Sequence, residues 1–197
     1  MPSIHLKPGD ALVIVDVQND FLPDGSLAVP RGDEVVPVLN GYIALFQQHA
    51  LPVYATRDWH PPDHCSFTAQ GGIWPSHCVG GTPGAAFAAG LSLPQGTLVI
   101  SKATTSESDA YSGFAGTDLA RCLCEHNGTR LFIGGLATDY CVLNTARDAL
   151  ALGFRVNLLL DAIRAVDVHP GDGDKAIDEM KRLGAGTARL DDFAREN

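Results

Sequence analysis

Short apolar runs alternate along this chain with segments of helical periodicity. Apolar runs of strand length, typical of strands buried on both faces, occupy residues 11–17, 52–58, 96–103, 129–135 and 154–162. Helical periodicity is found between them, over residues 33–50, 116–128 and 138–153. The pattern ends with a predicted helix over 172–184 and a predicted sixth strand over 185–190.

This alternation predicts the fold class. Parallel neighbouring strands need crossover connections, which helices supply, so the sheet should be covered on both faces. We expect one domain over residues 1–197, a three-layer α/β/α sandwich with a mainly parallel sheet of roughly six strands. Residues 57–95 lack periodicity and are long for a connector, which favours a functional loop inserted there. The third helix should begin with Thr138 or Asp139 as its N-cap and end at Gly153.

The composition fits a globular protein and argues against several function classes. Apolar residues make up 45% of the chain and charged residues 19%, which disfavours disorder. The net charge of -9 and the pI near 5.0 oppose nucleic-acid binding, which needs clustered Lys and Arg. The early apolar run ALVIV is too short for a signal peptide or a membrane span. We expect a cytoplasmic protein without nucleic-acid or membrane partners, and homo-oligomerisation is left open.

Cysteine usage indicates reduced thiols. The chain has five cysteines, an odd number, and no C-x-x-C pair, so neither a disulfide framework nor a zinc ribbon is indicated. Cys122 and Cys124 lie two positions apart on a predicted helix and therefore point in different directions. Small core or surface roles are expected for them.

Reactive side chains lie at the ends of four successive predicted strands. Asp16 closes the first strand, Asp58 follows the second, Lys102 closes the third, and Cys141 comes just after the fourth. In open α/β sheets, ligands bind beyond the carboxyl ends of the strands. We therefore expect these four side chains to converge on one edge of the sheet.

Each of these residues also has an ordinary structural explanation. An aspartate at a strand end is often a turn residue, a lysine is usually solvated, and a free cysteine is often a small buried hydrophobe. As a set they predict acyl transfer, with Cys141 as nucleophile and its thiolate favoured by the helix N-terminus and by Lys102. Asp16 would accept the thiol proton and return it to a leaving amine, while Lys102 holds that carboxylate.

The stretch RDWHPPDHCSF, residues 57–67, brings metal-binding side chains into an irregular loop. This stretch contains Asp58, His60 and His64, and His77 follows farther along the same loop. Together they offer carboxylate and imidazole ligands that suit zinc, iron or manganese. The two adjacent prolines would reduce the entropy lost when these ligands are fixed. Turn chemistry for the aspartate and ordinary hydrogen bonding for each histidine are the alternatives.

Aromatic residues frame the same region. Phe21 follows the first strand, Trp74 precedes the last of these histidines, and Tyr111 follows the third strand. Packing of an irregular region explains any one of them, whereas together they could sandwich a flat ring.

These residues carry a resemblance to a known family. The sequence resembles the nicotinamidase and pyrazinamidase group of the isochorismatase-like cysteine hydrolases. The matching blocks are VDVQNDF, SLAVP, TRDWHPPDHCSF, WPSHCVGGTPGAAF, SKATTSESDAYSGF and GLATDYCVLNTARDA. They extend in order from about residue 11 to residue 150, so the resemblance covers most of the chain.

The resemblance implies specific roles. The family's catalytic triad falls on Asp16, Lys102 and Cys141. Its metal ligands fall on Asp58, His60 and His77, which are expected to hold one divalent cation, zinc first, with iron or manganese as alternatives. His64 is left open as a further ligand or a supporting group. In the family the metal binds the pyridine nitrogen, with waters completing its coordination. The substrate-binding residues that the resemblance implies are Phe21, Trp74, Tyr111 and Leu136.

The GLATD segment corresponds to a family turn with a cis peptide bond, here between Leu136 and Ala137. The resemblance implies that the backbone N–H groups of Ala137 and Cys141 stabilise the oxyanion. One segment departs from the family pattern, because relatives commonly carry glycine directly after the lysine, where this chain has ATTSESDA. The tolerance for substituted rings therefore stays open.

The expected activity is hydrolysis of nicotinamide, and of pyrazinamide, to the acid and ammonia through a cysteine thioester, in pyridine nucleotide salvage. One alternative is a metal-free hydrolase of the same superfamily acting on another amide, a carbamoyl compound or an enol ether. A second alternative is a non-catalytic binding module that retains the fold. The complete set of Asp16, Lys102 and Cys141 counts against this second alternative.

Overall fold

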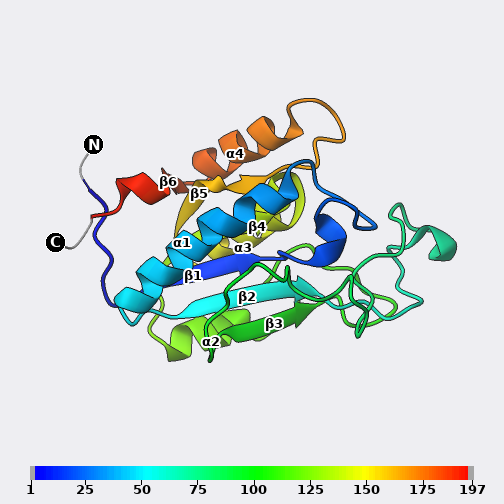
Figure 1. The fold of residues 1–197 in the computed structure, drawn as a ribbon, viewed down its shortest axis with the longest axis horizontal. Helices are drawn as coiled ribbons and strands as arrows, with labels where there is room; N and C mark the ends of the chain where they lie inside the picture. Colours follow the sequence, from blue (N-terminus) through cyan, green and yellow to red (C-terminus); the bar gives the residue numbers. More distant parts are fainter. Residues whose placement is uncertain (1–2, 195–197) are drawn as a thin grey trace.

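A parallel sheet lies at the centre of the protein in a computed structural model that describes residues 3–194. Its strands are β1 (Asp10–Val15), β2 (Val53–Asp58), β3 (Leu98–Lys102), β4 (Arg130–Leu136), β5 (Arg155–Arg164) and β6 (Gly186–Ala188). The six strands have the order β3-β2-β1-β4-β5-β6, and every neighbouring pair is parallel (Figure 1). The predicted fold class is therefore confirmed.

The apolar run of β1 is continuous because both faces of the sheet are covered. Successive side chains of a strand point to opposite faces. Leu12 and Ile14 accordingly pack in one core cluster, while Val13 and Val15 pack in the other, and every residue of β1 is buried. A strand that faced solvent on one side would show alternating polar residues instead.

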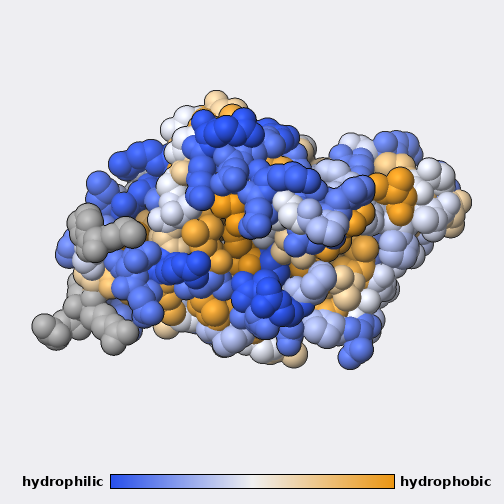
Figure 2. Space-filling model, turned by 90° about the horizontal axis from the view of Figure 1, so that it is seen from above, coloured by the Kyte–Doolittle hydropathy of each residue, from blue (hydrophilic) through white to orange (hydrophobic). Residues whose placement is uncertain are grey.

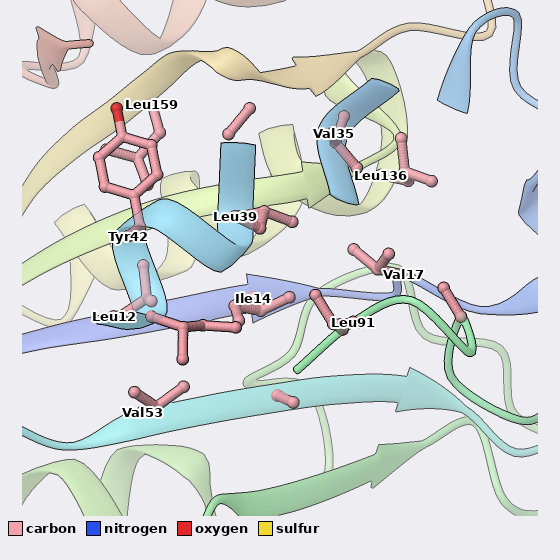
Figure 3. Packing of buried hydrophobic residues seen from close by; sticks show 14 of the residues in the cluster. Leu12, Ile14, Val17, Val35, Leu39, Tyr42, Val53, Leu91, Leu136 and Leu159 are labelled. Atoms are coloured by element: carbon pink, nitrogen blue, oxygen red, sulfur yellow. The ribbon is translucent and has the colours of Figure 1, made fainter. Parts of the chain in front are cut away.

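The helices form the two outer layers. They are α1 (Val35–Gln48), α2 (Leu119–Glu125), α3 (Leu143–Ala151) and α4 (Asp172–Arg182). Helix α1 packs Leu39 and Tyr42 against the face of the sheet that carries Leu12 and Ile14 (Figure 3). Helices α2, α3 and α4 contribute apolar side chains to the cluster on the other face.

The third predicted helix begins differently from the prediction. A single π-helical turn, Thr138–Val142, precedes α3, and neither Thr138 nor Asp139 caps it with a side-chain hydrogen bond. The N-cap prediction is wrong because the Asp139 carboxylate accepts hydrogen bonds from a distant loop instead. The predicted stop is correct, since Gly153 follows the helix with a φ of +88°.

The long connector between β2 and β3 has two parts. Its only regular element among the described residues is a short 3-10 turn, Thr68–Gln70. The first part projects beyond the carboxyl ends of the strands (Figure 1). The later part returns along the α1 face, where Ala85, Ala88 and Leu91 join the core cluster. The connector thus covers the edge of the sheet where the strands end and where the predicted reactive residues lie.

The surface mixes hydrophilic and hydrophobic residues (Figure 2). The face seen in Figure 2 is mostly hydrophilic, with hydrophobic residues showing between the polar ones. The exposed large hydrophobic residues lie on separate elements: Ile73, Val99, Leu152, Val168 and Leu183. Within residues 3–194, no helix combines the length and apolar character needed to cross a membrane.

Candidate active site

Three strands place Asp16, Lys102 and Cys141 at the same edge of the sheet. Asp16 directly follows β1 and has a φ of +49°, a left-handed conformation in which the chain turns out of the sheet. Lys102 is the last residue of β3, and Cys141 lies in the π-helical turn after β4. The structure therefore brings together the residues that the strand-end rule selected.

Lys102 is the centre of this group. Its Nζ lies 3.0 Å from Oδ2 of Asp16 and 3.5 Å from Sγ of Cys141. The same ammonium donates a hydrogen bond to Oδ1 of Asp58 and another, of 3.0 Å, to the carbonyl oxygen of Ala110. The residue is only 1% exposed, so its charge is balanced by protein groups rather than by water.

Asp16 is held by a second residue and keeps one oxygen available. Thr56 Oγ1 donates a hydrogen bond of 2.6 Å to Oδ1 of Asp16. Oδ2 pairs electrostatically with Lys102, yet it accepts no hydrogen bond within residues 3–194. A carboxylate oxygen of Asp16 lies within 4.8 Å of the Cys141 sulfur. The fixed carboxylate is therefore close enough to exchange a proton with the thiol after a small movement.

The charges of Asp58 and Lys102 stabilise each other. Burial opposes the charge of Asp58, but Lys102 and His60 outweigh it and lower the pKa of Asp58 below its ordinary value. Burial likewise opposes the charge of Lys102, and the carboxylates of Asp16 and Asp58 raise the pKa of Lys102 well above its ordinary value. Both groups are thus charged at neutral pH.

Cys141 and Asp16 behave differently. Burial raises the pKa of the Cys141 thiol well above its ordinary value, and the two carboxylates add to this effect against the attraction of Lys102. Burial also raises the pKa of Asp16, with Lys102 opposing. Lys102 favours the thiolate of Cys141, as expected, but burial and the two carboxylates that share this ammonium outweigh its attraction. The direction of this pKa shift fits the expected role of Asp16 as the acceptor of the thiol proton.

Asp58, His60 and His77 form a group that fits a divalent cation. One ligand atom from each lies within 4.8 Å of the others, and all three residues are buried. His60 Nδ1 donates to the carbonyl oxygen of Ala103 at 3.1 Å, and His77 Nδ1 donates to that of Pro75 at 2.8 Å. Each bond fixes the tautomer in which Nε2 carries the lone pair that a metal ligand needs.

Two further observations support this fit. Within residues 3–194, His60 Nε2 is a buried nitrogen without a hydrogen-bond partner, and burial lowers the pKa of His77, which keeps its ring neutral. The buried carboxylates of Asp16 and Asp58 also outnumber the single ammonium of Lys102. A divalent cation at this group would satisfy the orphan nitrogen and compensate the excess negative charge.

His64 lies beside these ligands without joining them. Its ring stacks on that of His60, with 4.1 Å between centroids. Its Nε2 donates to the carbonyl oxygen of Ser108 at 3.2 Å, and its Nδ1 accepts from the backbone N–H of Ser66 at 3.3 Å. Both ring nitrogens of His64 are thus engaged, and His64 does not belong to the group that Asp58, His60 and His77 form.

A cavity of about 470 Å³, its open mouth included, connects the thiol to the cation group. Cys141, Asp58, His60 and His77 all line it. Its apolar and aromatic walls come from separate segments of the chain: Phe21, Leu27, Val29, Trp74, Ala110, Tyr111, Ala137, Tyr140 and Val166. The cavity therefore offers a nucleophile, a candidate metal site and flat apolar walls.

The predicted aromatic residues do line this cavity. The ring of Phe21 lies against His77, with 5.7 Å between centroids. Trp74 Nε1 donates a hydrogen bond of 2.9 Å to the hydroxyl of Tyr111, which joins two loops across the cavity. Tyr140 packs against both Trp74 and Tyr111. Such an arrangement is suited to holding a flat ring.

Leu136 is placed differently from the prediction. Its side chain is fully buried in the α1-side core near Val35 and is not among the residues lining the cavity (Figure 3). The peptide bond between Leu136 and Ala137 is cis, as the resemblance implied. The preceding Gly135 has a φ of +123°, and a Cβ there would lie 2.1 Å from the carbonyl oxygen of Val15. Only glycine fits this close approach of β4 to β1.

Sequence reasoning missed several residues of the site. The sequence pattern places Tyr140 only on a predicted helix, although its neighbour Cys141 is the predicted nucleophile. Thr56 holds Asp16, and Gln18 holds the backbone of Asp58. Tyr140 adjoins the nucleophile and Gln18 lies in the VDVQNDF block, so motif position was a usable signal for both. No local pattern distinguishes Thr56 from other strand threonines.

Comparisons with known proteins agree with this geometry. Residues 10–192 match the family model described as the isochorismatase domain. The chain is 38% identical to the Escherichia coli nicotinamidase over 207 residues, which cover 94% of this chain and 97% of that protein. A Pyrococcus horikoshii pyrazinamidase structure in complex with zinc is 48% identical, with a TM-score of 0.89 and coverage of 92% of this chain and 99% of that chain.

A structure of an L. infantum protein in complex with nicotinate is 37% identical and has a TM-score of 0.89. It covers 98% of this chain, and 100% of that chain is matched. The family model extends over almost all of the described residues, and these relatives match along most of their own length. The resemblance seen in the sequence is confirmed, and the chain belongs to the isochorismatase domain family.

Proposed function

We propose that this protein is a metal-containing amidase that hydrolyses nicotinamide, and pyrazinamide, to the corresponding acid and ammonia. The observation that carries the proposal is the position of the Cys141 thiol, 3.5 Å from Lys102 Nζ and in the same cavity as Asp58, His60 and His77. The similarity to a nicotinamidase and to a zinc-bound pyrazinamidase supports it.

In the proposed first half-reaction, Asp16 takes the proton of the Cys141 thiol. The sulfur then attacks the carboxamide carbon, and the backbone N–H groups of Ala137 and Cys141 stabilise the oxyanion. When the C–N bond breaks, Asp16 returns the proton to the leaving nitrogen, and ammonia departs. Lys102 keeps the Asp16 carboxylate in place throughout and balances its charge.

In the second half-reaction, water attacks the thioester while Asp16 accepts its proton. The C–S bond breaks, the Cys141 sulfur is protonated again, and the acid product leaves. The aromatic walls formed by Phe21, Trp74 and Tyr111 hold the ring of the substrate during both halves. The raised pKa of Asp16 suits a group that must alternate between base and acid.

Asp58, His60 and His77 would hold the divalent cation, which would act as a Lewis acid toward the ring nitrogen of the substrate. One carboxylate and two imidazoles suit zinc, and iron and manganese accept the same donors. The ligands' own contribution is to fix the ring's distance from Cys141. The proposal includes zinc as the resident metal and a place for the reaction in pyridine nucleotide salvage.

Ammonia release from nicotinamide by the purified protein, combined with elemental analysis, tests the proposal. We expect turnover of nicotinamide and pyrazinamide, about one equivalent of bound metal, and loss of turnover after chelation. Pyridine carries the ring nitrogen and benzamide carries the carboxamide, so both should bind more weakly than nicotinamide. Full activity in metal-free protein, or no ammonia release by metal-loaded protein, would contradict it.

Replacing Asp16 by asparagine should lower kcat for nicotinamide by about 10² to 10⁴-fold, because general base catalysis contributes this much. Asparagine has nearly the same shape, and its amide can face Thr56 while its oxygen faces Lys102. The fold and the metal content should therefore persist. Steady-state ammonia release measures the effect.

Asp10→Asn is the matched control. Asp10 is also a buried carboxylate, pairs with Arg130, and is the first residue of β1, at the end of the strand opposite to Asp16. Its variant should keep kcat near that of the unmodified protein. Equal losses in the two variants would show that removal of a buried charge, rather than of the base, lowers activity.

Gln18→Ala should weaken metal binding by about 10 to 100-fold, the usual effect of removing a group that orients a ligand. The Gln18 side chain accepts a bond from the Asp58 N–H at 2.8 Å and donates to the Asp58 carbonyl at 2.8 Å. It also donates to the carbonyl of Ala85 at 2.9 Å. Its amide thus continues the β1–β2 ladder where the chain turns away at Asp16.

Competition with a chromogenic chelator measures the metal affinity directly, independently of turnover. Gln70→Ala, at an exposed glutamine of the Thr68–Gln70 turn, is the control and should bind the metal normally. If Gln18→Ala retained the unmodified affinity, the Gln18 amide would have no part in orienting Asp58.

A further inference from the structure

The loop between β5 and α4, residues 165–171, closes one side of the cavity. Val166 is half-buried and lines the cavity together with Ala137, Tyr140 and Cys141. The loop lies at the carboxyl end of the sheet, where it leads from β5 into α4 (Figure 1). The proposed mechanism uses no residue of this loop, so the cavity wall at this point depends on whatever holds the loop in place.

Asp139 holds it by two hydrogen bonds. Oδ1 of Asp139 accepts from the N–H of Val166 at 3.0 Å, and Oδ2 accepts from the N–H of Asp167 at 2.9 Å. Hydrogen bonds to a carboxylate are stronger than those between neutral groups. Asp139 lies two residues before Cys141 in the same π-helical turn. The clamp therefore joins the cavity wall to the segment that carries the nucleophile.

The far end of the loop has little freedom. Asp167 has a φ of +52°, and its Oδ1 accepts a hydrogen bond of 2.7 Å from the N–H of Gly173 in the first turn of α4. A Cβ at Gly173 would lie 2.6 Å from the Cβ of Ala165, so the backbones are packed closely there. With this end fixed, the Asp139 carboxylate decides how far Val166 extends into the cavity.

We propose that Asp139 is a positioning residue that sets the width of the cavity through Val166, and thereby restricts which ring substituents are accepted. The inference rests on the proposed amidase function. Asp139 is not itself among the residues lining the cavity, so it acts through the loop and not by contact with the substrate. Loosening the clamp should relax the selection among rings more than it slows the chemistry.

Asp139→Asn tests this proposal, because asparagine offers one acceptor oxygen and turns an amide group toward the second N–H. The substrates are nicotinamide and its 5-methyl and 6-methyl derivatives, assayed by ammonia release. We expect KM for nicotinamide to rise about 3 to 10-fold with kcat little changed, since loss of fixed positioning weakens binding of the small ring. For at least one methyl derivative, the ratio of kcat/KM for nicotinamide to kcat/KM for that derivative should fall about tenfold. One methyl group can produce a difference of this size.

Val166→Ala widens the wall directly and should reproduce the altered preference. In the double variant Asp139→Asn/Val166→Ala, the second substitution should change the substrate preference little further, because the effects of residues that act through one contact are not additive. Asp172→Asn is the matched control, because Asp172 accepts the N–H of His169 in the same loop at 3.0 Å while His169 is not a cavity residue. Its substrate preference should be unchanged.

A second measurement separates this proposal from the proposed function. The rate at which Cys141 is alkylated by iodoacetamide is compared with that for the bulkier N-phenylmaleimide, by peptide mass spectrometry. Asp139→Asn should raise the relative rate of the bulkier reagent about 3-fold or more, whether or not nicotinamide is the substrate. Unchanged relative alkylation rates and substrate preference in Asp139→Asn, or fully additive effects with Val166→Ala, would overturn the proposal.

Discussion

Replacing Cys141 by alanine is expected to lower kcat for nicotinamide by about 10⁴-fold or more, since loss of the nucleophile removes the covalent route entirely. Among the described residues that line the cavity, Cys141 is the only one with a thiol. Its sulfur is the atom that both Lys102 and Asp16 approach. Ammonia release and the burst of acyl-enzyme measured by mass spectrometry should both disappear.

The fold should survive this change, which makes the result interpretable. Cys141 is 6% exposed and packs in the core cluster shared by α2, α3 and α4, where alanine leaves only a sulfur-sized gap. Metal content and the melting temperature should therefore change little. Cys124→Ala, at an exposed cysteine of α2, should keep full activity. Retained turnover in Cys141→Ala would eliminate the thioester mechanism.

The position of this nucleophile was predictable from the sequence for a geometric reason. Parallel strands all end at the same edge of the sheet, so residues at successive strand ends must meet. Asp16, Lys102 and Cys141 come from β1, β3 and the turn after β4, and only the strand pattern was needed to bring them together. The apolar runs were long and continuous enough for that pattern to be clear.

Contacts that depend on the path of a loop were not predictable in this way. The sequence predicts either Thr138 or Asp139 as the N-cap of the third helix, yet the Asp139 carboxylate accepts hydrogen bonds from the loop at Val166 and Asp167. Both roles suit an aspartate before a helix, and the choice depends on where a loop from another part of the chain lies. The position of Leu136 was not predictable for a similar reason. Its side chain lies in the core, whereas the next residue, Ala137, lines the cavity.

The protonation of the thiol also depended on the assembled structure. A lysine beside a cysteine favours the thiolate when the two are isolated. Here Asp16 and Asp58 share the same ammonium and the site is buried, so the pKa of Cys141 is raised. The register of β2 and β3, in which Asp58 pairs with Lys102, creates this sharing. The sequence identified the groups, whereas the balance among them required their distances.

Lys102→Met is expected to destabilise the fold by about 3–5 kcal/mol, as removal of one partner from a buried ion pair does. Methionine fills a similar volume, but in the metal-free protein, which is the form to be measured, it leaves the carboxylates of Asp16 and Asp58 buried side by side without a counter-charge. The hydrogen bond to the Ala110 carbonyl is lost as well. Activity should be lost with the stability, because Asp16 is no longer held as the base. Chemical denaturation measures the free energy of unfolding.

Two comparisons show whether the unpaired charge causes this loss. Lys175→Met removes an exposed lysine, 2.9 Å from Asp172, and should change the free energy of unfolding by less than about 1 kcal/mol. The double variant Lys102→Met/Asp16→Asn should be more stable than Lys102→Met by about 1 kcal/mol or more, because one of the two uncompensated carboxylates is gone. If Asp16→Asn instead destabilised the Lys102→Met protein further, the cause would be lost packing around the lysine side chain. The proposed balance of charge among Lys102, Asp16 and Asp58 would then have to be revised.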